Sequence, residues 1–126
     1  MQNLFAGIDS STQGTKLLVI DLDDGAVVWV DAVNYDMDLP HYRTKNGVRQ
    51  TDQVGVSESD PKMWIEALDV LFARLQASEI PQEKIKAISV SGQQHGLVTL
   101  DADGNLTRPM SKLWNDFSTQ EECDLL

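Results

Sequence analysis

Three apolar runs at the start of the chain, separated by short polar turns, constrain the fold most strongly. The runs cover residues 3–9, 16–22 and 26–34, and their β-branched and aromatic residues favour strands. Residues 10–15 form the first polar turn, and Asp23-Asp24-Gly25 forms the second. Because Asp-Gly between two apolar runs is a strong hairpin signal, we expect an antiparallel meander of three strands.

A helix is predicted after a long polar segment. Residues 35–59 are polar and irregular, which is long for a loop in a compact domain. Asp60 then suits an N-cap and Pro61 the first helical position. One apolar face follows, made of Trp64, Leu68, Leu71 and Leu75, before Ile80-Pro81 ends the helix. We expect this face, with Trp64 as an anchor, to pack on the sheet.

The last third of the chain predicts short extended pieces. Residues 84–90 form a strand pattern, and residues 97–101 and Leu106 flank a second hairpin signal, Asp101-Ala-Asp-Gly-Asn105. Residues 111–116 suggest a short extended piece. A helix is expected to begin at Thr119, with Glu122 completing a capping box, and the chain ends before that helix could finish.

Composition argues against several classes of partner. The chain has 126 residues, enough for one domain with its own core. Its net charge of −10 argues against nucleic acid and against an anionic membrane, since both attract clustered positive charge. The single cysteine excludes an internal disulfide. Without a signal-peptide pattern or a long apolar stretch, the expected location is cytoplasmic.

The first turn has the composition of a phosphate-binding turn. Tight turns aim backbone N–H groups into one concavity that binds anions, and Gly14 permits a positive φ. Asp9 precedes the turn and suits Mg²⁺ or its waters, while Lys16 supplies a positive charge. The glycine spacing fits neither the dinucleotide nor the Walker pattern. From these residues alone, an ordinary polar hairpin and a phosphate clamp are equally supported.

Gly7-Ile8-Asp9, with Ser11-Thr12 and Lys16, resembles the first phosphate motif of the actin-like ATPase superfamily. That superfamily includes sugar kinases, Hsp70-type chaperones and actin. The resemblance implies an α/β fold of the ribonuclease H-like or actin-like ATPase class. Its mixed sheet would contain the three-strand meander, then a helix and a parallel strand, here in truncated form. This motif does not separate the branches of the superfamily.

Two later stretches resemble the sugar-side motifs of the FGGY carbohydrate kinases. They are Ser91-Gly92-Gln93-Gln94-His95-Gly96 and Leu113-Trp114-Asn115-Asp116. Their side chains offer the donors and acceptors that sugar hydroxyls need, and glycines let a loop lie close to a ligand. Trp114 suits a core position nearly as well. The resemblance covers essentially the whole chain, but only the opening part of such a kinase.

The family resemblance implies a set of site residues and cofactors. Asp9 would lie near the metal, through water, and near the γ-phosphate of ATP. The ATP phosphates would face Ser11, Thr12, Gln13 and Gly14, with Lys16 beside them, and the sugar would contact Gln94, His95, Asn115 and Asp116. The cofactors would be ATP and Mg²⁺. No catalytic base is assigned, because the family's general base, second phosphate motif and adenosine pocket come downstream of Leu126.

Within the family, the chain most resembles the xylulose kinases, especially the eukaryotic type, through residues 9–16, 38–42, 59–75 and 91–96. The resemblance implies that the parent protein converts D-xylulose to D-xylulose 5-phosphate. Residues 1–126 would form the N-terminal portion of its first domain, inactive alone and without the second domain. Glycerol fits less well, because a glycerol kinase carries Arg-Glu in place of Gln94-His95.

Other hypotheses stay open at this point. The substrate could be ribulose, another ketose or a polyol. A chaperone- or actin-like ATPase would share the first turn but does not need the two sugar-side motifs. A non-catalytic interaction module could keep the same fold. Residues 35–59 either cover the sugar or form a subunit contact, which would make the full-length protein a homodimer.

Overall fold

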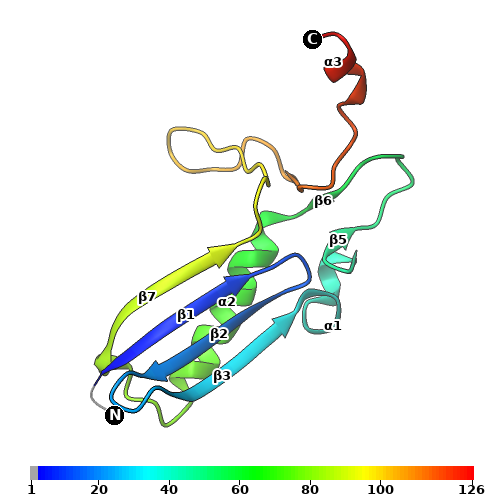
Figure 1. Cartoon of the computed structure of the whole chain (residues 1–126). Coiled ribbons are helices and arrows are strands. Elements are labelled where there is room, and N and C mark those ends of the chain that lie inside the picture. Colours follow the sequence, from blue (N-terminus) through cyan, green and yellow to red (C-terminus); the bar gives the residue numbers. More distant parts are fainter. Residues whose placement is uncertain (1–2) are drawn as a thin grey trace.

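The computed structural model describes residues 3–126, and its centre is a four-stranded sheet (Figure 1). The strands are β1 (Leu4–Ser10), β2 (Gly14–Asp21), β3 (Ala26–Asn34) and β7 (Ile85–Gly92), in the order β3-β2-β1-β7. The β1–β2 and β2–β3 pairs are antiparallel, and β7 is parallel to β1. The predicted meander and mixed sheet are therefore confirmed.

Helix α2 (Pro61–Gln76) covers one face of the sheet. Alternate residues of β1 and β2 point toward it, among them the buried Leu4, Leu17 and Val19, as the two-residue period of a strand requires. The Asp60 carboxylate caps the helix by accepting from the N–H of Lys62. As predicted, Asp60 and Pro61 begin the helix.

The predicted helix face is confirmed for Leu71 and Leu75, while two details of the helix differ. Its fully packed face consists of Met63, Ala67, Leu71 and Leu75, whereas Trp64 and Leu68 are only partly buried against the core. The helix also ends at Gln76 rather than near Ile80. Its last turn closes there because the carbonyl of Leu75 accepts from the hydroxyl of Ser78 and the amide of Gln82.

The segment of residues 35–59 was predicted to be irregular, but it contains five short elements. These are α1 (Tyr35–Asp38), the 3₁₀ helix η1 (Pro40–Tyr42), β4 (Thr44–Lys45), β5 (Val48–Arg49) and β6 (Glu58–Ser59). Local polar contacts explain the difference. The side chain of Asn34 caps α1, and the carboxylate of Asp36 accepts from Thr44, Asn46 and Gly47.

The remaining elements are the 3₁₀ helix η2 (Gln82–Lys84), β8 (Ser111–Lys112) and α3 (Gln120–Asp124). The predicted second hairpin is present as a bridge between Leu100 and Leu106, and β8 pairs with β6. α3 follows Thr119, but Thr119 makes no side-chain capping bond, so the predicted capping box does not form. Figure 1 shows α3 projecting away from the sheet. Among residues 3–126, no helix has the length and apolar character needed to cross a membrane.

Candidate active site

The first turn is tighter than the sequence suggested. β1 continues through Ser10 and β2 begins at Gly14, and the N–H of Ser11 donates to the carbonyl of Gly14 at 2.9 Å. Asp9 lies opposite Lys16 in the β1–β2 register, and both side chains are exposed. By the alternation of each strand, both belong to the face that α2 does not cover. A negative and a positive group therefore stand beside the turn.

A cavity of about 250 Å³ lies along this turn. Its lining brings together five residues predicted for the metal and ATP side, which are Asp9, Ser11, Gln13, Gly14 and Lys16. The hydroxyl of Ser11 also donates to the carboxylate of Asp9 at 2.9 Å. The structure therefore places most of the residues predicted to bind the metal and the ATP phosphates around one cavity.

Asp9 has the chemistry of a magnesium ligand. Its carboxylate is exposed beside the cavity, and Mg²⁺ in phosphate sites usually takes one or two carboxylates together with phosphate oxygens and waters. Within residues 3–126, no three His, Cys, Asp or Glu side chains form a metal-binding group.

Gly14 is required for a different reason than its conformational freedom. The positive-φ glycines of residues 3–126 are Gly25, Gly47, Gly55 and Gly104, and Gly14 is not among them. A Cβ added at Gly14 would instead lie 2.5 Å from the carbonyl oxygen of Val33. Close approach of β3 to the start of β2, rather than a left-handed turn, explains the glycine.

The second predicted loop begins beside the first turn. Because β7 is parallel to β1, Gly92 pairs with Ser10, and the N–H of Gln93 donates to the carbonyl of Ser10 at 3.0 Å. The hydroxyl of Thr12 lies 3.4 Å from the side-chain oxygen of Gln93. Both loops thus leave the carboxyl ends of neighbouring parallel strands, where open α/β sheets bind ligands.

Gln94 and His95 occupy the outer part of this second loop. Both are exposed. His95 adopts φ +63°, in the left-handed region that is uncommon for any residue except glycine. Such backbone conformations cluster at binding and active sites, but Arg43 and Asn46 in the β4–β5 region share this one, so the role of His95 stays a prediction.

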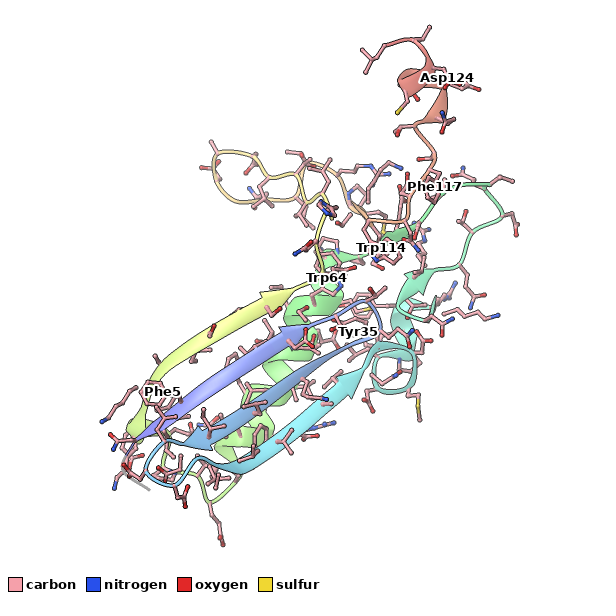
Figure 2. The ribbon with its side chains drawn as sticks, in the orientation of Figure 1. Phe5, Tyr35, Trp64, Trp114, Phe117 and Asp124 are labelled. Atoms are coloured by element: carbon pink, nitrogen blue, oxygen red, sulfur yellow. The ribbon has the colours of Figure 1, made fainter. Side chains whose placement is uncertain are left out.

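Trp64 lines a cavity beside the second loop as well as packing against the core. Together with Ser10, Gly92, Gln93 and Gly96, it lines a cavity of about 230 Å³ under the second loop. Its indole N–H is buried and has no hydrogen-bond partner within residues 3–126. Figure 2 shows Trp64 at the end of α2 that lies nearest to the carboxyl end of β7. Helical spacing predicted only a core role, because it carries no information about which loop crosses above the helix.

Asn115 and Asp116 are held by a different part of the chain. The Oδ1 of Asn115 accepts from the hydroxyl of Ser57 at 2.6 Å, and the carboxylate of Asp116 accepts from the N–H of Ser57 at 2.8 Å. Lys112 Nζ lies 3.1 Å from the same carboxylate. Within residues 3–126, no hydrogen bond joins either residue to Gln94 or His95, so their contact with a sugar stays a prediction. Trp114 is 57% exposed, which does not support the core alternative.

The hydrogen bonds around Asp116 predict loss of stability in acid. Its side chain is 3% exposed. Burial alone would raise the pKa of Asp116, but hydrogen bonds from Ser118, Ser57 and Lys112 outweigh burial and lower the pKa from 3.8 to about 2. A carboxyl group whose pKa is lower in the folded than in the unfolded protein stabilises the fold at pH values above its ordinary pKa. This contribution is lost as the pH falls from about 4 to about 2.

We therefore expect Asp116→Asn to lower the free energy of unfolding by about 2 kcal/mol at neutral pH, and the difference from the wild type to shrink below about pH 4. The thermal unfolding midpoint, measured between pH 3 and pH 7, checks this. Asp52→Asn removes the same charge from an exposed position and is the control. A difference between Asp116→Asn and the wild type that does not change with pH would contradict the assignment.

Comparison with known proteins identifies the family. Residues 4–126 match the N-terminal domain of the FGGY family of carbohydrate kinases. Xylulose kinase 2 of Arabidopsis thaliana is 36% identical over 96% of this chain and 25% of its own length. A xylulose kinase of Streptomyces rubiginosus is 42% identical over 90% of this chain and 20% of its own length.

The solved structures agree with the sequence relatives. A crystal structure of a xyloylose kinase from Brucella ovis superposes with a TM-score of 0.76 at 32% identity, covering 98% of this chain and 23% of that one. The predicted α/β fold class is thereby confirmed. The chain spans about a quarter of the length of the curated relatives that it matches. On the strength of the match over residues 4–126, the chain belongs to the FGGY family of carbohydrate kinases.

Proposed function

We propose that the chain is the N-terminal portion of the first domain of an ATP-dependent kinase that converts D-xylulose to D-xylulose 5-phosphate. One observation carries this proposal: the turn at residues 10–14 and the loop at residues 93–96 adjoin, linked by the hydrogen bond from Gln93 N–H to the Ser10 carbonyl. Phosphoryl transfer depends on holding donor and acceptor side by side. The names of the relatives support xylulose as the sugar.

In this proposal, each loop handles one substrate. Ser11, Thr12, Gln13 and Gly14 of the first turn line the place of the ATP phosphates, and Lys16 offsets part of their charge. Asp9 holds Mg²⁺ or its waters; when bound, Mg²⁺ neutralises charge on the β- and γ-phosphates. Gln94 and His95 orient the sugar, joined by Asn115 and Asp116. The general base and the adenosine pocket lie outside residues 1–126.

Assays of the full-length protein test this function. We expect ADP formation with D-xylulose to exceed that with D-ribulose or glycerol in kcat/KM, and residues 1–126 alone to show no turnover above a no-protein control. Preference for another ketose or a polyol would correct the substrate only. A rate of ATP hydrolysis that does not change when any sugar is added would instead indicate a chaperone- or actin-like ATPase. Absence of both ATP and sugar binding would favour an interaction module.

His95 offers a specific test of the sugar side. We expect His95→Ala to raise the KM for D-xylulose about tenfold and to leave the KM for ATP within about twofold, because losing one good polar contact costs about 1–3 kcal/mol. His95→Asn should separate side chain from backbone, since asparagine tolerates the left-handed conformation. Steady-state kinetics measure both constants.

His41→Ala is the matched control for His95. His41 is an exposed histidine that contacts Glu66 at 3.0 Å on the η1 side of α2. We expect its replacement to leave both KM values near those of the wild type. If His95→Ala behaves like His41→Ala, His95 does not belong to the sugar site.

A further inference from the structure

Tyr35 places a buried hydroxyl directly beneath the first turn. It is the first residue of α1, immediately after β3, and it is 0% exposed. Figure 2 shows Tyr35 beside the end of the β1–β2 hairpin, between that turn and α1. Its Oη lies 2.8 Å from Thr15 Oγ1, 3.2 Å from the Ser11 carbonyl oxygen and 3.4 Å from Ser10 Oγ.

These three contacts use the full hydrogen-bonding capacity of the phenol. A tyrosine hydroxyl donates once and accepts twice. Donation to the carbonyl of Ser11 leaves its two acceptor positions for the hydroxyls of Thr15 and Ser10. The three partners belong to the end of β1, the turn itself and the start of β2. One buried group thus fastens both sides of the turn.

The backbone of Tyr35 holds the tip of the same turn. Its N–H donates to the carbonyl of Gln13 at 3.1 Å. Gln13 and Ser11 also line the cavity on the open side of the turn, where the ATP phosphates are proposed to bind. Tyr35 therefore fixes the inner side of a segment whose outer side is free for a ligand.

Fixing this segment in advance has a functional consequence. Hydrogen-bond donors stabilise developing charge most effectively when they are already oriented, because no reorganisation is then needed during the reaction. A polar turn without an anchor would have to be ordered when ATP binds, at an entropic cost. The rigid ring of Tyr35 avoids much of that cost.

We propose that Tyr35 is the positioning residue of the turn at residues 10–14, called the phosphate turn from here on. It acts through Thr15 and the carbonyl of Ser11 on the groups that bind the ATP phosphates. This inference rests on the proposed kinase function. It assigns Tyr35 no contact with either substrate. Its loss should therefore affect the use of ATP and spare the affinity for the sugar.

Tyr35→Phe in the full-length protein tests the proposal, because it keeps the ring and removes only the hydroxyl. We expect kcat/KM for ATP to fall at least about fivefold, as losing a buried hydrogen bond predicts, while the KM for D-xylulose stays within about twofold. The rise in unfolding temperature that ATP causes should also shrink. Tyr42→Phe is the matched control, since its hydroxyl donates to Glu66 at 2.7 Å, away from the turn.

Thr15 provides a second pair of variants. Thr15→Val removes one of the three partners of the Tyr35 hydroxyl and should reproduce part of the loss, whereas Thr15→Ser keeps the hydroxyl and should retain activity with ATP. The double variant Tyr35→Phe/Thr15→Val should lose little more than Tyr35→Phe alone, because the phenylalanine has already removed the contact that the valine would break. If Tyr35→Phe fails to fold, the comparison of valine with serine at Thr15 decides the matter.

The outcomes separate this inference from the proposed function. An inactive wild-type protein would overturn the kinase proposal itself. An active wild type with Tyr35→Phe equal to Tyr42→Phe in kcat/KM for ATP would overturn the role of Tyr35 alone. Equal losses for ATP and the sugar, in step with a lowered unfolding temperature, would show a merely structural tyrosine. Equal activity of Thr15→Val and Thr15→Ser would likewise count against the proposal.

Discussion

Replacing Gly47 with alanine is expected to destabilise the protein by about 3 kcal/mol or more and to displace the phosphate turn. Gly47 lies in the tight turn between β4 and β5 with φ +77°, and a Cβ there would come within 1.7 Å of the carbonyl oxygen of Thr12. That carbonyl belongs to the phosphate turn. The alanine therefore carries both a backbone cost and a steric clash.

The β4–β5 turn cannot easily move away from this clash. The carboxylate of Asp36 accepts from the N–H groups of Asn46 and Gly47 at 2.6 Å and 3.0 Å, and the hydroxyl of Ser59 donates to the Gly47 carbonyl. Relief of the clash must then come largely from Thr12 and its neighbours. We expect a raised KM for ATP together with a lowered thermal unfolding midpoint.

Gly25→Ala isolates the backbone part of this effect. Gly25 has φ +74°, but a Cβ added there would meet nothing within 4 Å. We expect this control to cost only about 1 kcal/mol and to leave the KM for ATP unchanged. If Gly47→Ala and Gly25→Ala lower the unfolding midpoint equally, a Cβ at position 47 does not clash with the phosphate turn.

Local patterns predicted the frame of this site well. The meander follows from runs of apolar residues with an Asp-Gly turn, and the start of α2 follows from Asp60 and Pro61, whose capping chemistry depends only on adjacent residues. The positions of the two loops then follow from strand direction. Once β7 is parallel to β1, the segments after Ser10 and Gly92 must emerge at the same edge.

Contacts between distant segments could not be predicted in the same way. Tyr35 and Gly47 are 20 or more residues from the turn that they contact, and no periodic pattern connects them to it. The sequence predicts an irregular segment at residues 35–59, because the order of this segment comes from side-chain bonds to Asp36, which leave no hydrophobic periodicity in the sequence. Trp64 shows a related limit, since its spacing reveals the helix face but not the loop above it.

Asp9→Asn is expected to slow phosphoryl transfer by the full-length protein about tenfold or more, with a smaller effect on the KM for D-xylulose. Removing a charged hydrogen-bonding partner costs about 1.5–3 kcal/mol, and each 1.4 kcal/mol is a factor of about ten in rate. The asparagine oxygen can still accept from Ser11, which now donates to Asp9 at 2.9 Å. The fold of the turn should therefore survive while its negative charge is lost.

The dependence on Mg²⁺ distinguishes this effect from general damage to the site. If Asp9 helps to hold Mg²⁺ beside the phosphates, the variant should need more Mg²⁺ for half-maximal rate at fixed ATP. Asp31→Asn is the control, because Asp31 also lies on the sheet but pairs with Arg74 at 3.2 Å on the surface, and such exposed pairs contribute at most about 1 kcal/mol. An Asp9→Asn variant with the kcat and Mg²⁺ requirement of the control would exclude Asp9 from the metal and phosphate side, and the cavity beside it would then need another explanation.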